Sequence, residues 1–138
     1  MAQCRTCARI VTQPWRVSAR IAVPPIPYRF ARDALEQTVA GVFMIGSVDL
    51  WSGTRGCSRA AFARQVAMYL AHVVLELSLT EVGQVFARDR TTVAYACSRV
   101  EDLRDGLVFD RSLELLESVL RALALASVHL PHQWRAGL

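Results

Sequence analysis

Residues 86–96, FARDRTTVAYA, decide how this chain folds. Five polar residues stand in a row before the segment becomes apolar: Arg88, Asp89, Arg90, Thr91 and Thr92. Aspartate is a favoured N-cap, because its carboxylate accepts hydrogen bonds from the free backbone N–H groups of a first helical turn. The apolar residues that follow recur at helical spacing: Val93, Ala96, Cys97 and Val100. The pattern therefore predicts a helix over 90–103 that buries one face, with Asp89 as its cap.

A shorter helix is predicted just before it, over 79–86. Ser78 and Glu81 stand three residues apart, as in a capping box, where each side chain accepts a hydrogen bond from the other residue's backbone N–H. Only the link Ala-Arg-Asp at 87–89 separates the two helices. Two short helices joined by so tight a link form a helix-turn-helix.

The polar start of the second helix has the chemistry needed to read DNA bases. In a helix-turn-helix this end enters the major groove. Arginine can bond guanine O6 and N7, aspartate can accept from the cytosine amino group, and threonine methyls can pack on thymine. Asp89, Arg90, Thr91 and Thr92 are therefore candidate base contacts. An ordinary solvated helix start is the alternative from the residues alone, and both interpretations stay open at this point.

The rest of the chain also has helical periodicity. Helices are predicted from Arg32 to just before Gly46, over 59–77 behind a Ser58 cap, and over 110–128, with one short turn in SVDLW at 47–51. The last helix carries a row of leucines: Leu113, Leu116, Leu120 and Leu123. No segment alternates as a strand does, so the predicted fold is all-α, a small domain of about five to six helices. Its expected limits are 31–128, between an irregular Arg-rich, Pro-containing arm at 1–30 and a flexible tail at 129–138.

The charge of the chain favours a polyanionic partner. Its 138 residues carry a net charge of +4, and all 16 basic residues are arginine. The first 30 residues hold five arginines and no acid, and residues 52–99 are also net basic. The absence of lysine excludes a P-loop and Schiff-base chemistry, so neither nucleotide binding nor that catalysis is expected.

No enzyme, metal or cofactor site is predicted. Cys4 and Cys7 form a lone CxxC, whereas a structural zinc site needs four ligands. No residue pair has the arrangement of a catalytic nucleophile and base.

Glu117 and Arg121, four residues apart, are expected to form a solvated ion pair. No apolar run is long enough for a membrane span, and a reducing, cytoplasmic location fits the cysteines.

From Ser58 to Val100 the sequence resembles the C-terminal DNA-binding domain of the bacterial replication initiator DnaA. The resemblance is carried by residues 63–97, ARQVAMYLAHVVLELSLTEVGQVFARDRTTVAYAC. Arg-Gln, Ala-Met, Ser-Leu, a Glu-Val-Gly step and an Arg-Asp-x-Thr-Thr-Val motif occur there in the order typical of that family. A weaker resemblance extends from about Ala31 to Gly106.

The resemblance implies a role for each matched residue. In the family, the residues that read bases are those at the positions of Asp89, Arg90, Thr91 and Thr92. Arg55, with Arg59 as the alternative, reaches the minor groove. The helix start at Ser78, Leu79 and Thr80 approaches the DNA backbone. Arg59, Arg64 and Arg88 are expected to hold phosphates.

Three departures from the family pattern affect these expectations. Arg90 replaces the family's histidine, which implies a different recognised sequence. The link between the helices is one residue shorter, and the loop at 52–59 holds fewer basic residues. Only about 30 residues precede the domain, so we expect a stand-alone reader without the initiator's ATPase module.

The expected function is sequence-specific binding of double-stranded DNA by a nucleoid-associated regulator of transcription or replication. The alternative is a protein-interaction module with a degenerate DnaA-like domain that docks a partner through its C-terminal helix. That helix is unusually apolar, LELLESVLRALALASVHL at 113–130. Packing on the first helix and a homodimer seam are two explanations that the sequence leaves open.

Overall fold

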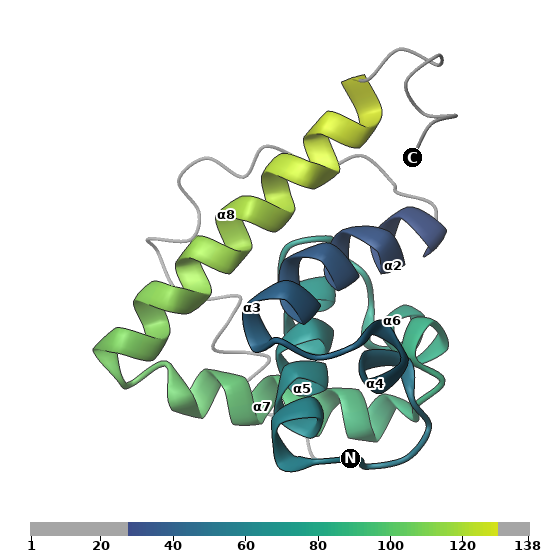
Figure 1. Cartoon of the computed structure of the whole chain (residues 1–138), viewed down its shortest axis with the longest axis vertical. Coiled ribbons are helices and arrows are strands. Elements are labelled where there is room, and N and C mark those ends of the chain that lie inside the picture. Colours follow the sequence, from purple (N-terminus) through teal and green to yellow (C-terminus); the bar gives the residue numbers. More distant parts are fainter. Residues whose placement is uncertain (1–27, 130–138) are drawn as a thin grey trace.

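Five helices surround a central one, α5, in the part of the chain that the structure describes. The computed structural model describes residues 28–129, with side chains to residue 127. Its elements are α2 (Tyr28–Leu35), a π-helical segment (Glu36–Ala40), α3 (Gly41–Phe43), α4 (Ser47–Trp51), α5 (Ser58–Val73), α6 (Leu79–Phe86), α7 (Arg90–Leu103) and α8 (Leu107–His129) (Figure 1). The first three form one continuous helix. The described residues contain no strand, which confirms the all-α prediction. Residues 1–27 of the predicted arm, with its CxxC, and the tail beyond residue 129 lie outside them, whereas residues 28–30 are helical and not irregular as predicted.

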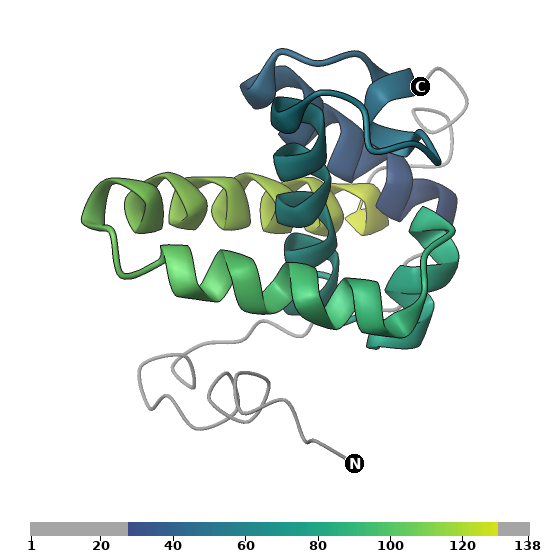
Figure 2. The ribbon, with the colours of Figure 1, turned by 90° about the horizontal axis from the view of Figure 1, so that it is seen from below.

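Helix α5 is the centre of the core. Val66, Tyr69 and Leu70 are fully buried, and α5 packs most extensively against α7, which it crosses in Figure 2. Burying a side chain of this size stabilises the fold by roughly 1.5–3 kcal/mol. None of the described helices has both the length and the apolar character that crossing a bilayer requires.

The predicted helix-turn-helix bounds are confirmed. Helices α6 and α7 span the predicted residues, and the face of α7 predicted to be buried is buried. The capping box is present: Ser78 N–H donates to Glu81 Oε2 at 2.7 Å, and Glu81 N–H donates to Ser78 Oγ at 3.2 Å. Asp89 stands at the N-cap of α7, but its side chain makes no capping hydrogen bond.

The limits of the other helices differ from the prediction. The first helix begins at Tyr28 and ends at Phe43, because Met44 adopts a left-handed conformation with φ 52°. Cys57, not Ser58, caps α5, since its Sγ accepts from Ala60 N–H at 3.4 Å. Helix α5 ends at Val73 although its apolar spacing continues to Leu77, because Glu76 is left-handed with φ 56°.

Helix α8 begins at Leu107 and packs on the first helix. Leu113, Leu116 and Leu120 are buried there, whereas Leu123 is only partly buried. The predicted Glu117–Arg121 pair is wrong, because Glu117 binds Arg104 at 2.8 Å. Packing on the first helix is thus the explanation that the structure supports for the leucine row.

Arg104 fastens the start of α8 to α5. Its guanidinium donates to Asp110 Oδ1 at 2.6 Å, Glu117 Oε1 at 2.8 Å and Tyr69 Oη at 2.7 Å. Burial lowers the pKa of Arg104, but the interactions with Tyr69, Glu117 and Asp110 outweigh it and the pKa is raised overall. Arg104 therefore stays charged, and a single side chain joins α5, α7 and α8.

Candidate nucleic-acid interface

A very close turn sets the angle between α6 and α7. Arg88 N–H donates to the Gly83 carbonyl at 2.8 Å, and Ala87 is left-handed with φ 51°. A Cβ at Gly83 would lie 2.5 Å from the Arg88 carbonyl oxygen, closer than two such atoms can approach. Glycine at 83 therefore allows the turn to fold back onto α6.

Helix α7 presents a polar face to solvent. Its buried face holds Val93 and Val100. The opposite face contains exposed side chains at helical spacing: Thr91, Thr92, Tyr95 and Arg99. Tyr95 is 61% exposed and lies in the middle of this face, one turn beyond the threonines.

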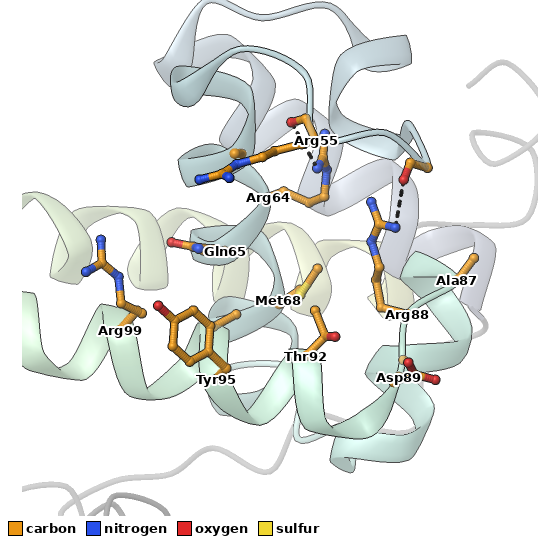
Figure 3. Close-up of a pocket in the computed structure, with 14 residues that line it drawn as sticks. Arg55, Arg64, Gln65, Met68, Ala87, Arg88, Asp89, Thr92, Tyr95 and Arg99 are labelled. Atoms are coloured by element: carbon orange, nitrogen blue, oxygen red, sulfur yellow. Dashed lines mark hydrogen bonds between the residues drawn. The ribbon is translucent and has the colours of Figure 1, made fainter.

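An open groove of about 970 Å³ lies between this helix, α5 and the loop at 52–56 (Figure 3). Four arginines line it: Arg55, Arg64, Arg88 and Arg99. Asp89 is the single acidic residue of the lining. Its other polar side chains include Gln65, Thr92 and Tyr95. A concave surface with this excess of guanidinium groups is suited to an extended anion.

Arg64 and Arg88 bind the backbone of α4 and of the loop that follows it. Arg64 is only 5% exposed and donates to the carbonyls of Leu50 at 3.1 Å, Asp49 at 2.8 Å and Arg55 at 3.5 Å. Arg88 donates to the carbonyls of Gly53 at 2.8 Å and Ser52 at 3.0 Å.

The environment of Arg64 is costly for its charge. Burial and the nearby Arg88 cation lower the pKa of Arg64, and Asp49 and Cys57 offset this in part. An arginine pKa remains far above neutral after such a change, so the guanidinium stays charged. The loop carbonyls supply the acceptors that this buried cation needs.

The structure brings some predicted site residues together and separates others. Arg55, Arg64, Arg88, Asp89 and Thr92 line the groove. The exposed residues Arg90 and Thr91 occupy the first turn of α7, at the edge of the groove lining. Four predicted backbone contacts are outside the lining: Arg59, Ser78, Leu79 and Thr80. Of these, Ser78 caps α6 and Leu79 packs against the core.

Sequence reasoning missed Tyr95, Arg99 and Gln65. The signal was available for the first two, since they follow Thr91 and Thr92 by one and two helical turns, opposite the buried face. Gln65 was noted only as part of a family motif. Its place in the groove depends on how α5 crosses α7, which no local pattern encodes.

No metal site competes with this interpretation within residues 28–127. The side chains described there include no cluster of three or more histidine, cysteine, aspartate or glutamate residues that could hold an ion. Cys57 is exposed, and Cys97 is buried in the core.

Comparisons with known proteins agree with the geometry. The family described as "Bacterial dnaA protein helix-turn-helix" matches residues 33–100. The chain is 36% identical over 104 residues to the chromosomal replication initiator protein DnaA of Symbiobacterium thermophilum, a match that covers 72% of this chain and 22% of that protein. The DnaA of Treponema denticola is 38% identical over 90 residues, which cover 64% of this chain and 18% of that protein.

A solved structure supports the same assignment. The crystal structure of a DNA replication initiation factor has a TM-score of 0.60 and 34% identity to this chain, and the match covers 68% of this chain and 30% of that one. This chain spans about a fifth of the length of the two curated DnaA relatives. The predicted resemblance is confirmed: through the domain at residues 33–100, this chain belongs to the helix-turn-helix family of the bacterial DnaA proteins.

Proposed function

We propose that the chain binds double-stranded DNA in a sequence-specific manner through α7 and the arginine-lined groove beside it. The observation that carries this proposal is the polar, exposed face of α7 at the edge of a groove with four arginines. The family's matched proteins are named as replication initiators, which supports a DNA partner.

The first turn of α7 enters the major groove and reads bases. Arg90 is suited to guanine and Asp89 to the cytosine amino group, and Thr91 and Thr92 pack on thymine methyls or bond base edges. The N-terminus of α7 adds free backbone N–H groups and the positive end of the helix dipole. Arg90 stands where the family has histidine, so the preferred sequence differs from that of the initiators.

The groove holds one phosphate backbone. In B-DNA a single sugar-phosphate strand separates each major groove from the neighbouring minor groove. With α7 in the major groove, that strand lies between α7 and the loop at 52–56, and Arg55 faces the minor groove beyond it. Arg99 and Tyr95 of α7 and Gln65 of α5 contact the same strand. Arg59, Ser78, Leu79 and Thr80 are proposed as further backbone contacts.

The cellular role proposed for such a reader is regulation of transcription or replication at the bacterial nucleoid. A regulator needs only a DNA-reading domain and a way to affect other proteins at its site. The proposal uses no nucleotide, cofactor or catalysis by this chain.

A second candidate is a protein-docking role for α8. This helix exposes large apolar side chains away from its packed face: Leu107, Val108, Leu115 and Val119. Apolar faces of this kind pair helices of two proteins, and a second copy of the chain is one such partner. Sedimentation velocity at increasing concentration tests the homodimer: a shift from monomer to dimer supports it, and a constant monomer mass contradicts it.

Duplex binding as a function of salt separates the two functions. Each neutralised phosphate contributes a slope of about −0.9 to a plot of log K against log salt concentration. Contacts by Arg55, Arg59 and Arg99 therefore predict a slope of about −3 for a labelled duplex. Absence of duplex binding at low salt would contradict the proposal and favour protein docking through α8.

A further inference from the structure

Arg64 and Arg88 occupy an unexpected position for phosphate contacts. Both lie in the groove, but their guanidinium groups point at the backbone of the loop at 52–56 and of the helix turn before it (Figure 3). Together they donate to five carbonyl groups, those of Asp49, Leu50, Ser52, Gly53 and Arg55. We call this pair of arginines the loop clamp.

The loop clamp joins two parts of the chain that are distant in sequence. Arg88 belongs to the turn of the helix-turn-helix, and its bonds to the loop span 35 and 36 residues. Arg64 belongs to α5, and it binds the loop at the Arg55 carbonyl and the end of α4, which leads into the loop, at the carbonyls of Asp49 and Leu50. Because the turn at Arg88 is itself fixed against Gly83, movement of the loop relative to α7 requires breaking these bonds.

Trp51 anchors the base of the same loop. Its Nε1–H donates to Glu36 Oε2 at 2.8 Å, and its ring lies 4.9 Å from that of Phe86, the last residue of α6. The guanidinium of Arg32 covers the Trp51 ring at 4.3 Å. The loop is therefore fixed to α6 at its base and to the turn at its tip.

We infer that Arg88 and Arg64 are positioning residues, which hold Arg55 at a fixed distance from the base-reading turn of α7. This inference rests on the proposed function, since Arg55 and α7 are assigned there to adjacent grooves. A fixed spacing lets the contacts on both sides of one phosphate strand form together, because ordering a free loop would oppose binding. The contribution of Arg55 to the choice of DNA sequence then depends on Arg88, although Arg88 itself touches no base.

A double-mutant cycle between Arg55 and Arg88 tests this inference. Arg55→Ala is expected to weaken binding of the selected duplex roughly tenfold in the wild-type protein. With Arg88→Ala in the background, the same change is expected to have less than about a twofold effect, since the loop no longer presents Arg55. Arg99→Ala is the matched control, because Arg99 lines the groove and is proposed to contact phosphate directly. Its effect should add to that of Arg55→Ala.

Arg88→Lys distinguishes positioning from a phosphate contact. Lysine keeps the positive charge but lacks the planar fork that reaches two carbonyls at once. If Arg88 positions the loop, Arg88→Lys shows the same loss of coupling to Arg55 as Arg88→Ala. If Arg88 holds a phosphate, Arg88→Lys keeps the salt slope of duplex binding, whereas Arg88→Ala lowers its magnitude by about 0.9. In that case the loss of binding free energy from either Arg88 variant adds to the loss from Arg55→Ala. That second result would overturn the inference.

A measurement without DNA keeps the inference separate from the proposed function. Bonds to the Ser52 and Gly53 carbonyls polarise the peptide groups whose N–H belongs to Gly53 and Thr54. NMR spectra of the free protein should show shifts of these two amide signals in Arg88→Lys but not in Arg99→Ala, with an otherwise unchanged spectrum. Unshifted amides would refute the loop clamp, and a shift in a protein that binds no DNA would refute only the proposed function.

Discussion

At the scale of single residues, Gly83 is the position where the helix-turn-helix tolerates least change. An added Cβ would meet the Arg88 carbonyl oxygen at 2.5 Å, and neither backbone can yield easily. Alanine normally improves a helix by up to about 1 kcal/mol over glycine, but such an overlap costs roughly 1–3 kcal/mol. We expect Gly83→Ala to lower the free energy of unfolding in urea by about 1 kcal/mol and to weaken DNA binding, because α7 is displaced.

Gly41 provides the matched control for this change. It is helical, and a Cβ built on it meets nothing within 4 Å. Gly41→Ala is expected to stabilise the protein by up to about 1 kcal/mol and to leave DNA binding unchanged. Equal effects of the two substitutions would contradict the importance of the close turn.

Arg90 is the residue whose identity should decide the preferred base sequence. It is exposed on the first turn of α7. We expect Arg90→Ala to cost roughly 1–3 kcal/mol of binding free energy and to relax selection at one base pair. Titration of a duplex set with single base-pair changes measures this. An equal loss on every duplex would mean that Arg90 contacts phosphate instead.

From the sequence, the residues that line the groove were easier to predict than the groups to which they bind. Asp89 and Thr92 could be singled out from a local motif and Arg55 from the family resemblance, and all three line the groove. Arg64 and Arg88 were predicted to hold phosphates, but they bind carbonyls of α4 and of the loop after it, between 9 and 36 residues away in sequence. Partners at such separations depend on how helices cross, and a single sequence carries no direct signal of that.

At the scale of elements, the capping box determines where α6 begins. Both of its hydrogen bonds are present, and Ser78 supplies one of them. Ser78→Ala is expected to lower the free energy of unfolding by about 1 kcal/mol. Ser58→Ala is the control, because Cys57 caps α5 in its place, and it should change stability little. Comparable losses from both serines, measured by urea unfolding, would contradict the assignment of the caps.

The contribution of Glu81 to this cap depends on pH. Its bonds with the Ser78 side chain and backbone lower the pKa of Glu81 below its usual 4.5. A carboxylate with a depressed folded pKa stabilises the native state above the unfolded pKa and stops doing so as pH falls through the folded one. The stability difference between Glu81→Gln and the native chain should therefore be present at neutral pH and shrink below about pH 4.5. A difference that stays constant down to pH 3 would exclude an ionic contribution.

The ends of a helix could be predicted where a capping residue nearby in sequence marks them. The prediction was wrong where the backbone leaves the helix while the apolar spacing continues. The bounds of α6 and α7 follow from Ser78, Glu81 and the short link. The end of α5 does not, because apolar spacing continues to Leu77 while Glu76 turns left-handed. Such a stop satisfies carbonyl groups at the helix end and leaves no mark in hydrophobic periodicity.

At the scale of the whole molecule, Arg104 holds α8 onto the domain. Removing it leaves Glu117 and Asp110 without their partner in a partly buried site. Breaking a buried ion pair on one side costs about 3–5 kcal/mol, and partial exposure places the expected loss for Arg104→Ala near the lower value. Arg111→Ala, an exposed arginine on α8, should change stability by less than about 0.5 kcal/mol. Similar urea midpoints for the two variants would contradict the role assigned to Arg104.

The most direct test of sequence-specific DNA binding is selection of bound duplexes from a random pool at about 150 mM salt. The proposed function predicts that a single sequence motif is enriched. When the selection is repeated with the Arg90→Ala variant, the preference at one base pair of that motif should be weaker. Binding without enrichment, lost uniformly as salt rises, would contradict sequence reading by α7. Absence of binding would contradict the DNA-binding function as a whole.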